Sequence, residues 1–230
     1  MDTHSENWQS FLYGSTSSSN GNLKTFCLGH SAGAHVCGFA GKTHKLDGII
    51  GLDPAGTIFK DNYEDGRLSK EDAKFVQVLH IDAGELGIDK AIGHQDIFIN
   101  GGINQPGCWG IVSEALCSHV PFALNFQLKM FQQVSIHDAC YANIKCATEN
   151  DAMNTKLESC MQLTGSQVKM GAIFDNVSEQ NTGIFYLDTT NPEIGPCYLT
   201  IGSLEEDAFG INDAFKAGIN AWIPRGWQNA

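Results

Sequence analysis

Short apolar runs alternate with polar stretches along the chain, and their lengths predict both strands and helices. Leu23–Leu28, Leu46–Leu52 and Phe75–Ile81 are apolar and rich in branched residues, as buried strands are. Small apolar residues over Ala32–Ala40 predict a helix packed on a sheet, and Ile184–Leu187 predicts a late strand. Strand, helix and strand in succession indicate an α/β sheet with parallel pairing.

The remaining segments carry weaker patterns. Apolar residues at helical spacing predict a helix over Val120–Val134, and Glu6–Tyr13 has the pattern of the end of another. The Ser/Gly/Asn run from Ser15 to Asn22 predicts a loop. Residues 191–230 change to proline, glycine and acidic residues, so we expect a C-terminal tail there, to which the pattern assigns no role.

Composition limits the classes of protein to which this chain can belong. Its 230 residues, 42% of them hydrophobic, suffice for one sizeable domain. Asp and Glu number 26 against 14 Lys and Arg, which gives a net charge of −12. This balance argues against a nucleic-acid partner and against a polybasic membrane anchor. No apolar run reaches the roughly eighteen residues of a transmembrane helix.

Eight cysteines indicate an oxidising compartment, so we expect a secreted protein with disulfides. No Cys-x2-Cys pair occurs, which argues against zinc. Cys27 and Cys37 fall in the predicted strand and helix, where we expect buried thiols rather than a bridge. Two disulfides, in any of three pairings, could form among Cys140, Cys146, Cys160 and Cys197.

A Gly-x-Ser-x-Gly pentapeptide, Gly29–Gly33, lies between the first predicted strand and the first predicted helix. A nucleophile elbow requires this context, because its glycines let strand and helix approach closely while Ser31 is held at a sharp turn. The backbone amide of Ala32, at the helix N-terminus, could then face a developing oxyanion. The alternative is an ordinary glycine-rich turn.

An elbow serine needs an orienting acid and a base, expected in the chain order Ser, Asp, His. Two acids, Asp53 and Asp82, follow predicted strands, where ligands of open α/β sheets bind. The histidines after Asp53 are His80, His94, His119 and His137. His80 lies inside a predicted strand and fits a core residue, whereas His119 lies in a loop between a cysteine and a proline. These patterns alone leave open which acid and which histidine would act with Ser31.

Six segments, in order and at compatible spacings, resemble the pancreatic-lipase-like family of secreted α/β-hydrolases. They are Leu28–Lys42 (LGHSAGAHVCGFAGK), Gly51–Gly56 (GLDPAG), Arg67–Val76 (RLSKEDAKFV), Ile92–Gly102 (IGHQDIFINGG), Gln105–Cys108 (QPGC) and Cys117–His119 (CSH). The resemblance implies an α/β-hydrolase domain over residues 1–190. It also implies that Ser31 is the nucleophile, Asp53 the orienting acid and His119 the general base, since this family keeps its acid in the GLDPAG turn.

The resemblance also bears on the substrate, a lipid ester. The lid disulfide of the family corresponds to Cys108 and Cys117, which would close only the eight residues Trp109–Leu116. This short lid and the short segment Ala83–Gly93 look like the phospholipase A1 branch typical of arthropods, which implies cleavage of the sn-1 ester of phospholipids. The alternatives are a neutral triacylglycerol lipase and a non-catalytic lipid-binding or storage protein like the yolk proteins.

Some family members bind calcium in the loop after the acid. The matching positions here are Glu64, the carbonyl of Arg67, and Asp72, while Ser69 stands where the pattern has another acidic ligand. Two carboxylates are few for a calcium cage, so we expect a solvated charged loop, with no metal and no cofactor.

The chain departs from the family pattern at its start. Only thirty residues precede Ser31, whereas family members have several strands and one oxyanion donor before the elbow. Residues 1–6 show neither the basic nor the apolar region of a signal peptide. We therefore expect a mostly parallel sheet without its N-terminal strands, in a fragment of a longer product or a degenerate relative.

Overall fold

The structure is a computed structural model. It describes residues 25–59, 64–103, 105–106, 108, 118–119, 140–154, 157–164, 167–171 and 182–190. The described strands are β1 Phe26–His30, β2 Leu46–Leu52, β3 Ala73–His80, β4 Gln95–Ile99, β5 Tyr141–Ala142, β6 Ile144–Cys146, β7 Met161–Gln162, β8 Val168–Lys169 and β9 Gly183–Leu187. The helices are α1 Ala32–Thr43, α4 Glu149–Met153 and the short 3-10 turns η2 Glu64–Gly66, η3 Lys70–Asp72 and η6 Leu157–Ser159.

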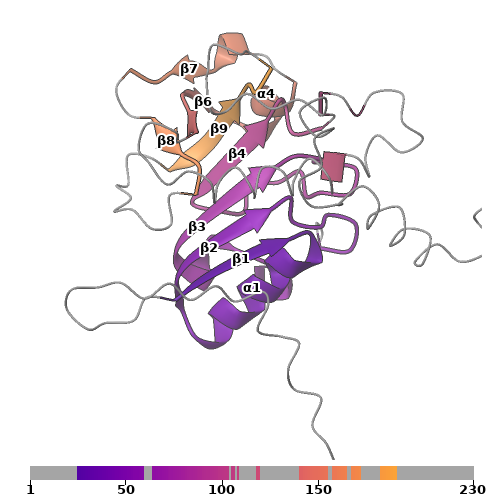
Figure 1. The fold of residues 1–230 in the computed structure, drawn as a ribbon, viewed down its shortest axis with the longest axis vertical. Helices are drawn as coiled ribbons and strands as arrows, with labels where there is room; N and C mark the ends of the chain where they lie inside the picture. The colour runs from indigo at the N-terminus through magenta and orange to yellow at the C-terminus, as the bar shows by residue number, and fades with distance from the viewer. Residues whose placement is uncertain are drawn as a thin grey trace, which may run out of the picture.

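A mostly parallel sheet organises these elements (Figure 1). Its strand order is β1-β2-β3-β4-β9-β6-β7, and β1, β2, β3, β4 and β9 pair in parallel. β6 pairs antiparallel with β9 and with β7, while β5 and β8 form a separate two-stranded sheet. The predicted α/β class is confirmed. Within the described ranges, no helix is both long and apolar enough to cross a bilayer.

Apolar side chains cover both faces of the sheet. Neighbouring residues of a strand point to opposite faces, so Ile49 of β2 packs in one cluster with Ala34 of α1, whereas Ile50 packs in another with Leu79 and Phe185. Burial on both faces is typical of parallel strands and gives them continuous apolar runs rather than alternation. This is why β2 could be predicted with its observed bounds.

Other predicted elements differ in their bounds or lie outside the described residues. The observed β1, α1, β3 and β9 each overlap their predicted segments, with α1 extending to Thr43. β4 was not predicted, because Gln95 and Asp96 are polar yet buried and leave a short apolar run. The segments Glu6–Tyr13, Ser15–Asn22 and Val120–Val134 and the tail 191–230 lie outside the described residues.

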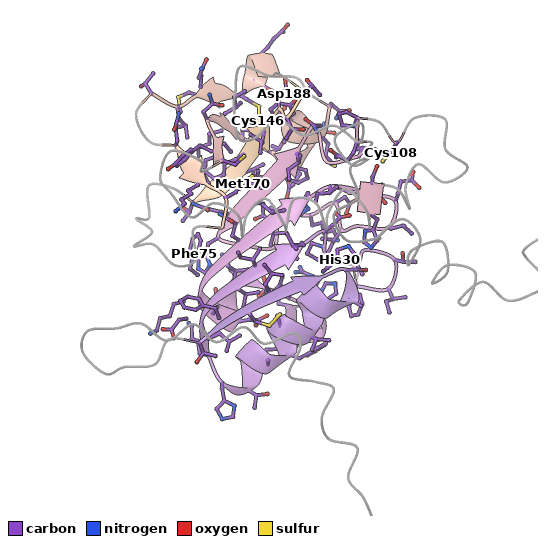
Figure 2. All side chains as sticks on the ribbon, in the orientation of Figure 1. His30, Phe75, Cys108, Cys146, Met170 and Asp188 are labelled. Atoms are coloured by element: carbon purple, nitrogen blue, oxygen red, sulfur yellow. A yellow bond between two sulfur atoms is a disulfide. The ribbon has the colours of Figure 1, made fainter. Side chains whose placement is uncertain are left out.

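Figure 2 draws disulfides as yellow bonds between sulfur atoms, and one disulfide contradicts the sequence-based prediction. Cys27 and Cys37 form a disulfide with a Cα–Cα distance of 5.7 Å, so the expectation of buried thiols is wrong. The elbow turn folds α1 back onto β1, which brings the two side chains face to face. Cys146 pairs with Cys160. Cys108 and Cys140 each take part in a disulfide as well. Cys117, the partner predicted for Cys108, lies outside the described residues.

Candidate active site

Ser31 occupies a sharp turn between β1 and α1. Its backbone has φ 54° and ψ −124°, in the positive-φ region that non-glycine residues rarely adopt. Its N–H donates a hydrogen bond of 3.0 Å to the carbonyl of Leu52, at the end of β2. The strained turn thus presents the Ser31 side chain at the carboxyl edge of the sheet, as a nucleophile elbow does.

The two glycines of the pentapeptide differ in their surroundings. A Cβ on Gly29 would overlap the backbone carbonyl of Gly33, so the close approach of strand and helix depends on glycine at this position. A Cβ on Gly33 would meet no described atom within 4 Å. The expected packing role therefore holds for Gly29, while nothing in the described part of the chain requires glycine at position 33.

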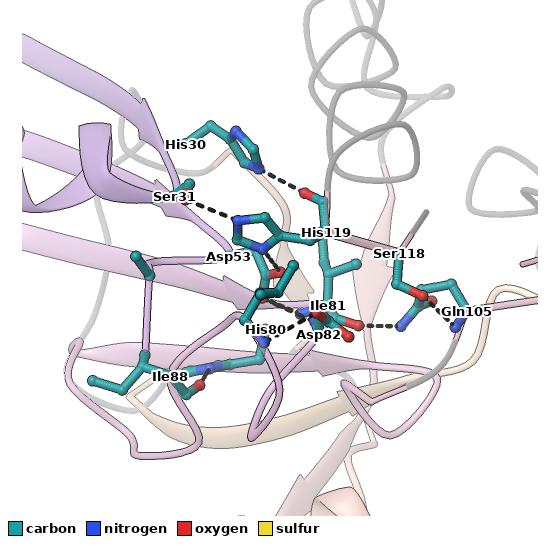
Figure 3. A network of polar contacts seen from close by, with 12 residues as sticks. His30, Ser31, Asp53, His80, Ile81, Asp82, Ile88, Gln105, Ser118 and His119 are labelled. Carbon is teal, nitrogen blue, oxygen red and sulfur yellow. Dashed lines mark hydrogen bonds and ion pairs between the residues drawn. The ribbon is translucent and has the colours of Figure 1, made fainter. Parts of the chain in front are cut away.

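Three side chains from separate parts of the chain form a continuous hydrogen-bonded series (Figure 3). His119 Nε2 lies 2.8 Å from Ser31 Oγ, and His119 Nδ1 lies 2.7 Å from Asp53 Oδ2. Asp53 is fully buried and His119 is 6% exposed. The structure thus brings together the serine, acid and histidine that the sequence predicted. Such a series can pass the hydroxyl proton of serine to the imidazole.

The Asp53 carboxylate is held by the backbone at the end of β3. Its Oδ1 accepts hydrogen bonds from the N–H groups of Ile81 and Asp82, at 2.9 and 3.0 Å. The Asp53 N–H donates to the carbonyl of Leu79 at 2.8 Å, and its own φ is 42°. These bonds fix the carboxylate so that its Oδ2 faces His119.

Asp82, the other candidate acid, lies beside this series but outside it. One ligand atom each of Asp53, Asp82 and His119 lies within 4.8 Å of the others. Asp82 is fully buried; its Oδ2 accepts the N–H of Leu86 at 3.2 Å, and its Oδ1 has no partner in the described part of the structure. Burial, and then the negative charge of Asp53, raises the pKa of Asp82 to about 7.

The other candidate histidines have structural partners. His80 is buried, with Nδ1 2.9 Å from the carbonyl of Ile88 and Nε2 2.9 Å from Asp96 Oδ1. This agrees with its predicted place in the core. His94 Nδ1 accepts the N–H of Val76. His137 lies outside the described residues.

The loop considered for calcium is organised by a lysine. Asp72 Oδ1 lies 2.6 Å from Lys42 Nζ and also accepts the hydroxyl of Ser69, while Oδ2 accepts the Ser69 N–H. Glu64 is exposed in η2. Both Asp72 oxygens are therefore engaged by groups of the protein itself.

Sequence reasoning missed the residues that hold Ser118 and His119. His30 Nε2 lies 2.6 Å from the carbonyl oxygen of His119. On the other side, the N–H of Gln105 donates to Ser118 Oγ at 3.1 Å, and Gln105 Nε2 donates to the carbonyl of Ile81 at 2.8 Å. His30 and Gln105 both lie in segments that carry the family resemblance, but no spacing or residue type there indicates which side chains support the site.

Comparison with known proteins places this chain in a family. The family model described as Lipase matches residues 10–193. The chain is 36% identical over 166 residues to a phospholipase A1 of Vespula squamosa, a match covering 70% of this chain and 51% of that protein. It is 37% identical over 143 residues to Lipase member H of Rattus norvegicus (59% and 30%), and 48% identical over 98 residues to phospholipase A1 1 of Dolichovespula maculata (40% and 30%). The chain thus spans about half or less of the length of these relatives. It belongs to the lipase family.

Proposed function

We propose that the protein is a secreted lipid-ester hydrolase that uses Ser31, His119 and Asp53 as a catalytic triad. The observation that carries this proposal is the hydrogen-bonded series from Ser31 Oγ through His119 to Asp53 Oδ2, with contacts of 2.8 and 2.7 Å. Membership of the lipase family supports the same reaction class.

Each member of the series has a distinct task in ester cleavage. Asp53 holds the proton of His119 on Nδ1, which leaves the lone pair of Nε2 facing Ser31 Oγ. When Oγ adds to the acyl carbonyl, His119 takes the hydroxyl proton and then gives it to the departing alkoxide. Water, deprotonated by the same imidazole, then releases the fatty acid and restores Ser31.

The backbone N–H of Ala32 supplies one oxyanion donor in this proposal. Ala32 is the first residue of α1, so its N–H has no acceptor within the helix. It adjoins the nucleophile, and the positive end of the helix dipole favours negative charge there.

The preferred substrate is a phospholipid, cleaved at its sn-1 ester. Two of the wasp relatives are phospholipases A1 by name. The short segment 83–93 also folds back onto the turn that holds Asp53, because the Gly56 N–H donates to Leu86 and the Ile88 N–H donates to Pro54. In this proposal, a short segment held against that turn is what admits a polar head group. The predicted Cys108–Cys117 bridge would shorten the lid as well.

Extracellular location fits the cysteine chemistry. No described cysteine is free, and the bridges Cys27–Cys37 and Cys146–Cys160 need an oxidising compartment to persist. The partners in this proposal are phospholipid surfaces, with no nucleic acid and no cofactor.

Positional analysis of the products tests the proposal. The natural full-length protein is given phosphatidylcholine with different acyl chains at sn-1 and sn-2, and separately a triacylglycerol emulsion. We expect release of the sn-1 fatty acid, loss of at least about a thousandfold in rate for Ser31→Ala, and the parent rate for Thr164→Ala, a control that removes an exposed hydroxyl. Preferential cleavage of triacylglycerol would favour the neutral-lipase alternative. Vesicle binding without cleavage would favour a storage protein.

A further inference from the structure

The side chain of His30 reaches from the end of β1 to the backbone of the histidine of the triad. Its Nε2 lies 2.6 Å from the carbonyl oxygen of His119, and the two rings lie 4.9 Å apart at 44° (Figure 3). A carbonyl oxygen only accepts hydrogen bonds, so His30 must carry its hydrogen on Nε2 and donate it. The residue before the nucleophile thus fixes the backbone of the residue that takes the nucleophile's proton.

Ser118 and His119 are held on two sides. The hydroxyl of Ser118 accepts the N–H of Gln105 on the side of β4, and the carbonyl of His119 accepts His30 on the side of the elbow. Among the described residues, removing the His30 bond would leave the imidazole contacts of His119 with Ser31 and Asp53 to hold the second side. Placement of the base against the nucleophile is sensitive, because a displacement of about 1 Å can cost about a hundredfold in rate.

We propose that His30 is a positioning residue for the proposed reaction, and that it acts as a neutral hydrogen-bond donor to His119. The inference rests on the proposed function. His30 contacts no reacting atom; it fixes the backbone of His119, whose side chain reaches both Ser31 and Asp53.

Charge explains why the neutral form matters. His119 becomes positively charged as it takes the proton of Ser31, and a second imidazolium about 5 Å away would oppose that charge. Burial lowers the pKa of His30 from its ordinary 6.5, and the bond to the His119 carbonyl partly opposes this. Of the charged groups in the described part of the chain, His119 lowers the pKa of His30 and Asp53 raises it. In the proposed reaction, protonation of His30 at acidic pH should therefore lower the activity.

Two substitutions separate the hydrogen bond from the ring. His30→Gln keeps a side-chain N–H that can reach the carbonyl but cannot take a charge, whereas His30→Phe keeps an aromatic ring and loses the donor. The matched control is His44→Gln, because His44 is exposed at the end of α1. All are measured in the natural full-length protein, by hydrolysis of phosphatidylcholine and by the rate at which a fluorophosphonate labels Ser31.

For His30→Phe we expect kcat and the labelling rate to fall about ten- to a hundredfold, with KM within about twofold of the parent value. His30→Gln should keep kcat within a few-fold, and its rate should fall less steeply with acid than the rate of the parent. Parent-like kcat in His30→Phe would overturn the proposal. An equal loss of rate in both variants would also overturn it. So would a pH–rate profile in which the rate of His30→Gln falls with acid as steeply as that of the parent.

These outcomes are distinct from failure of the proposed function. If Ser31 is not the nucleophile, neither lipid cleavage nor labelling depends on it, and Ser31→Ala reveals this in the same assays. If His30→Phe fails to fold, the comparison of His30→Gln with the parent and with His44→Gln still decides the point through its pH profile.

Discussion

Replacing Asp82 with asparagine should stabilise the folded protein at pH 8 and change its stability much less at pH 5. The parent carboxyl is fully buried beside Asp53, with a pKa of about 7 against an ordinary 3.8. Between these two pH values the folded state holds a proton that the unfolded state has released. The free energy of unfolding therefore falls as pH rises through this window, and it levels off above pH 7.

The size of the effect follows from the pKa difference. Each pH unit in the window costs about 1.4 kcal/mol, so the parent loses about 4 kcal/mol across all of it and about 3 kcal/mol between pH 5 and pH 8. Asparagine carries no charge at either pH. Its amide oxygen can still accept the N–H of Leu86, and its NH2 group takes the place of the oxygen that has no described partner.

Guanidinium chloride unfolding at pH 5, 6, 7 and 8, with the disulfides intact, measures this effect. The quantity to plot is the difference in unfolding free energy between Asp82→Asn and the parent. We expect it to rise by about 3 kcal/mol from pH 5 to pH 8, whereas Asp65→Asn, at an exposed position in η2, should give a flat line. A flat line for Asp82→Asn as well would refute the assignment of a protonated carboxyl to the folded state.

Two further predictions concern the elbow. Replacing both Cys27 and Cys37 by alanine should lower the unfolding free energy by about 3 kcal/mol, because their bridge closes a loop of ten residues; unchanged guanidinium unfolding would contradict this. Gly29→Ala places a methyl group against the backbone of the first turn of α1, so we expect a loss of at least about 2 kcal/mol in stability and a lower rate of Ser31 labelling. Parent-like values in both measurements would show that strand and helix can separate there without cost.

The parts of the fold that could be predicted from the sequence are those in which local pattern and tertiary role agree. β2 is almost continuously apolar because it is buried on both faces, and α1 follows the serine of a Gly-x-Ser-x-Gly turn. β4 escaped prediction because its buried polar side chains find partners far away in sequence. Asp96 Oδ1, for example, lies 2.9 Å from Nε2 of His80, which is 16 residues away in sequence. Sequence pattern does not show such partners.

The Cys27–Cys37 bridge and the role of His30 were missed for a similar reason. Each depends on how a turn directs two side chains, and residue type alone does not give that direction. A cysteine in a strand and another in the next helix are equally compatible with two thiols. In this chain the elbow folds α1 back over β1, which turns Cys27 and Cys37 toward each other. The same turn directs His30 toward the backbone carbonyl of His119.

The choice between Asp53 and Asp82 shows how backbone direction decides chemistry. Both acids follow apolar runs at the carboxyl edge of the sheet, and both lie near His119. The chain turns at Asp53 with φ 42°, and its carboxylate receives two backbone N–H groups from the end of β3, one of them from Asp82 itself. Asp82 receives one longer bond and leaves an oxygen without a described partner. Burial and the charge of Asp53 raise the pKa of Asp82 to about 7. In the proposed mechanism, the acid that faces His119 is therefore the one that already receives two hydrogen bonds from the backbone.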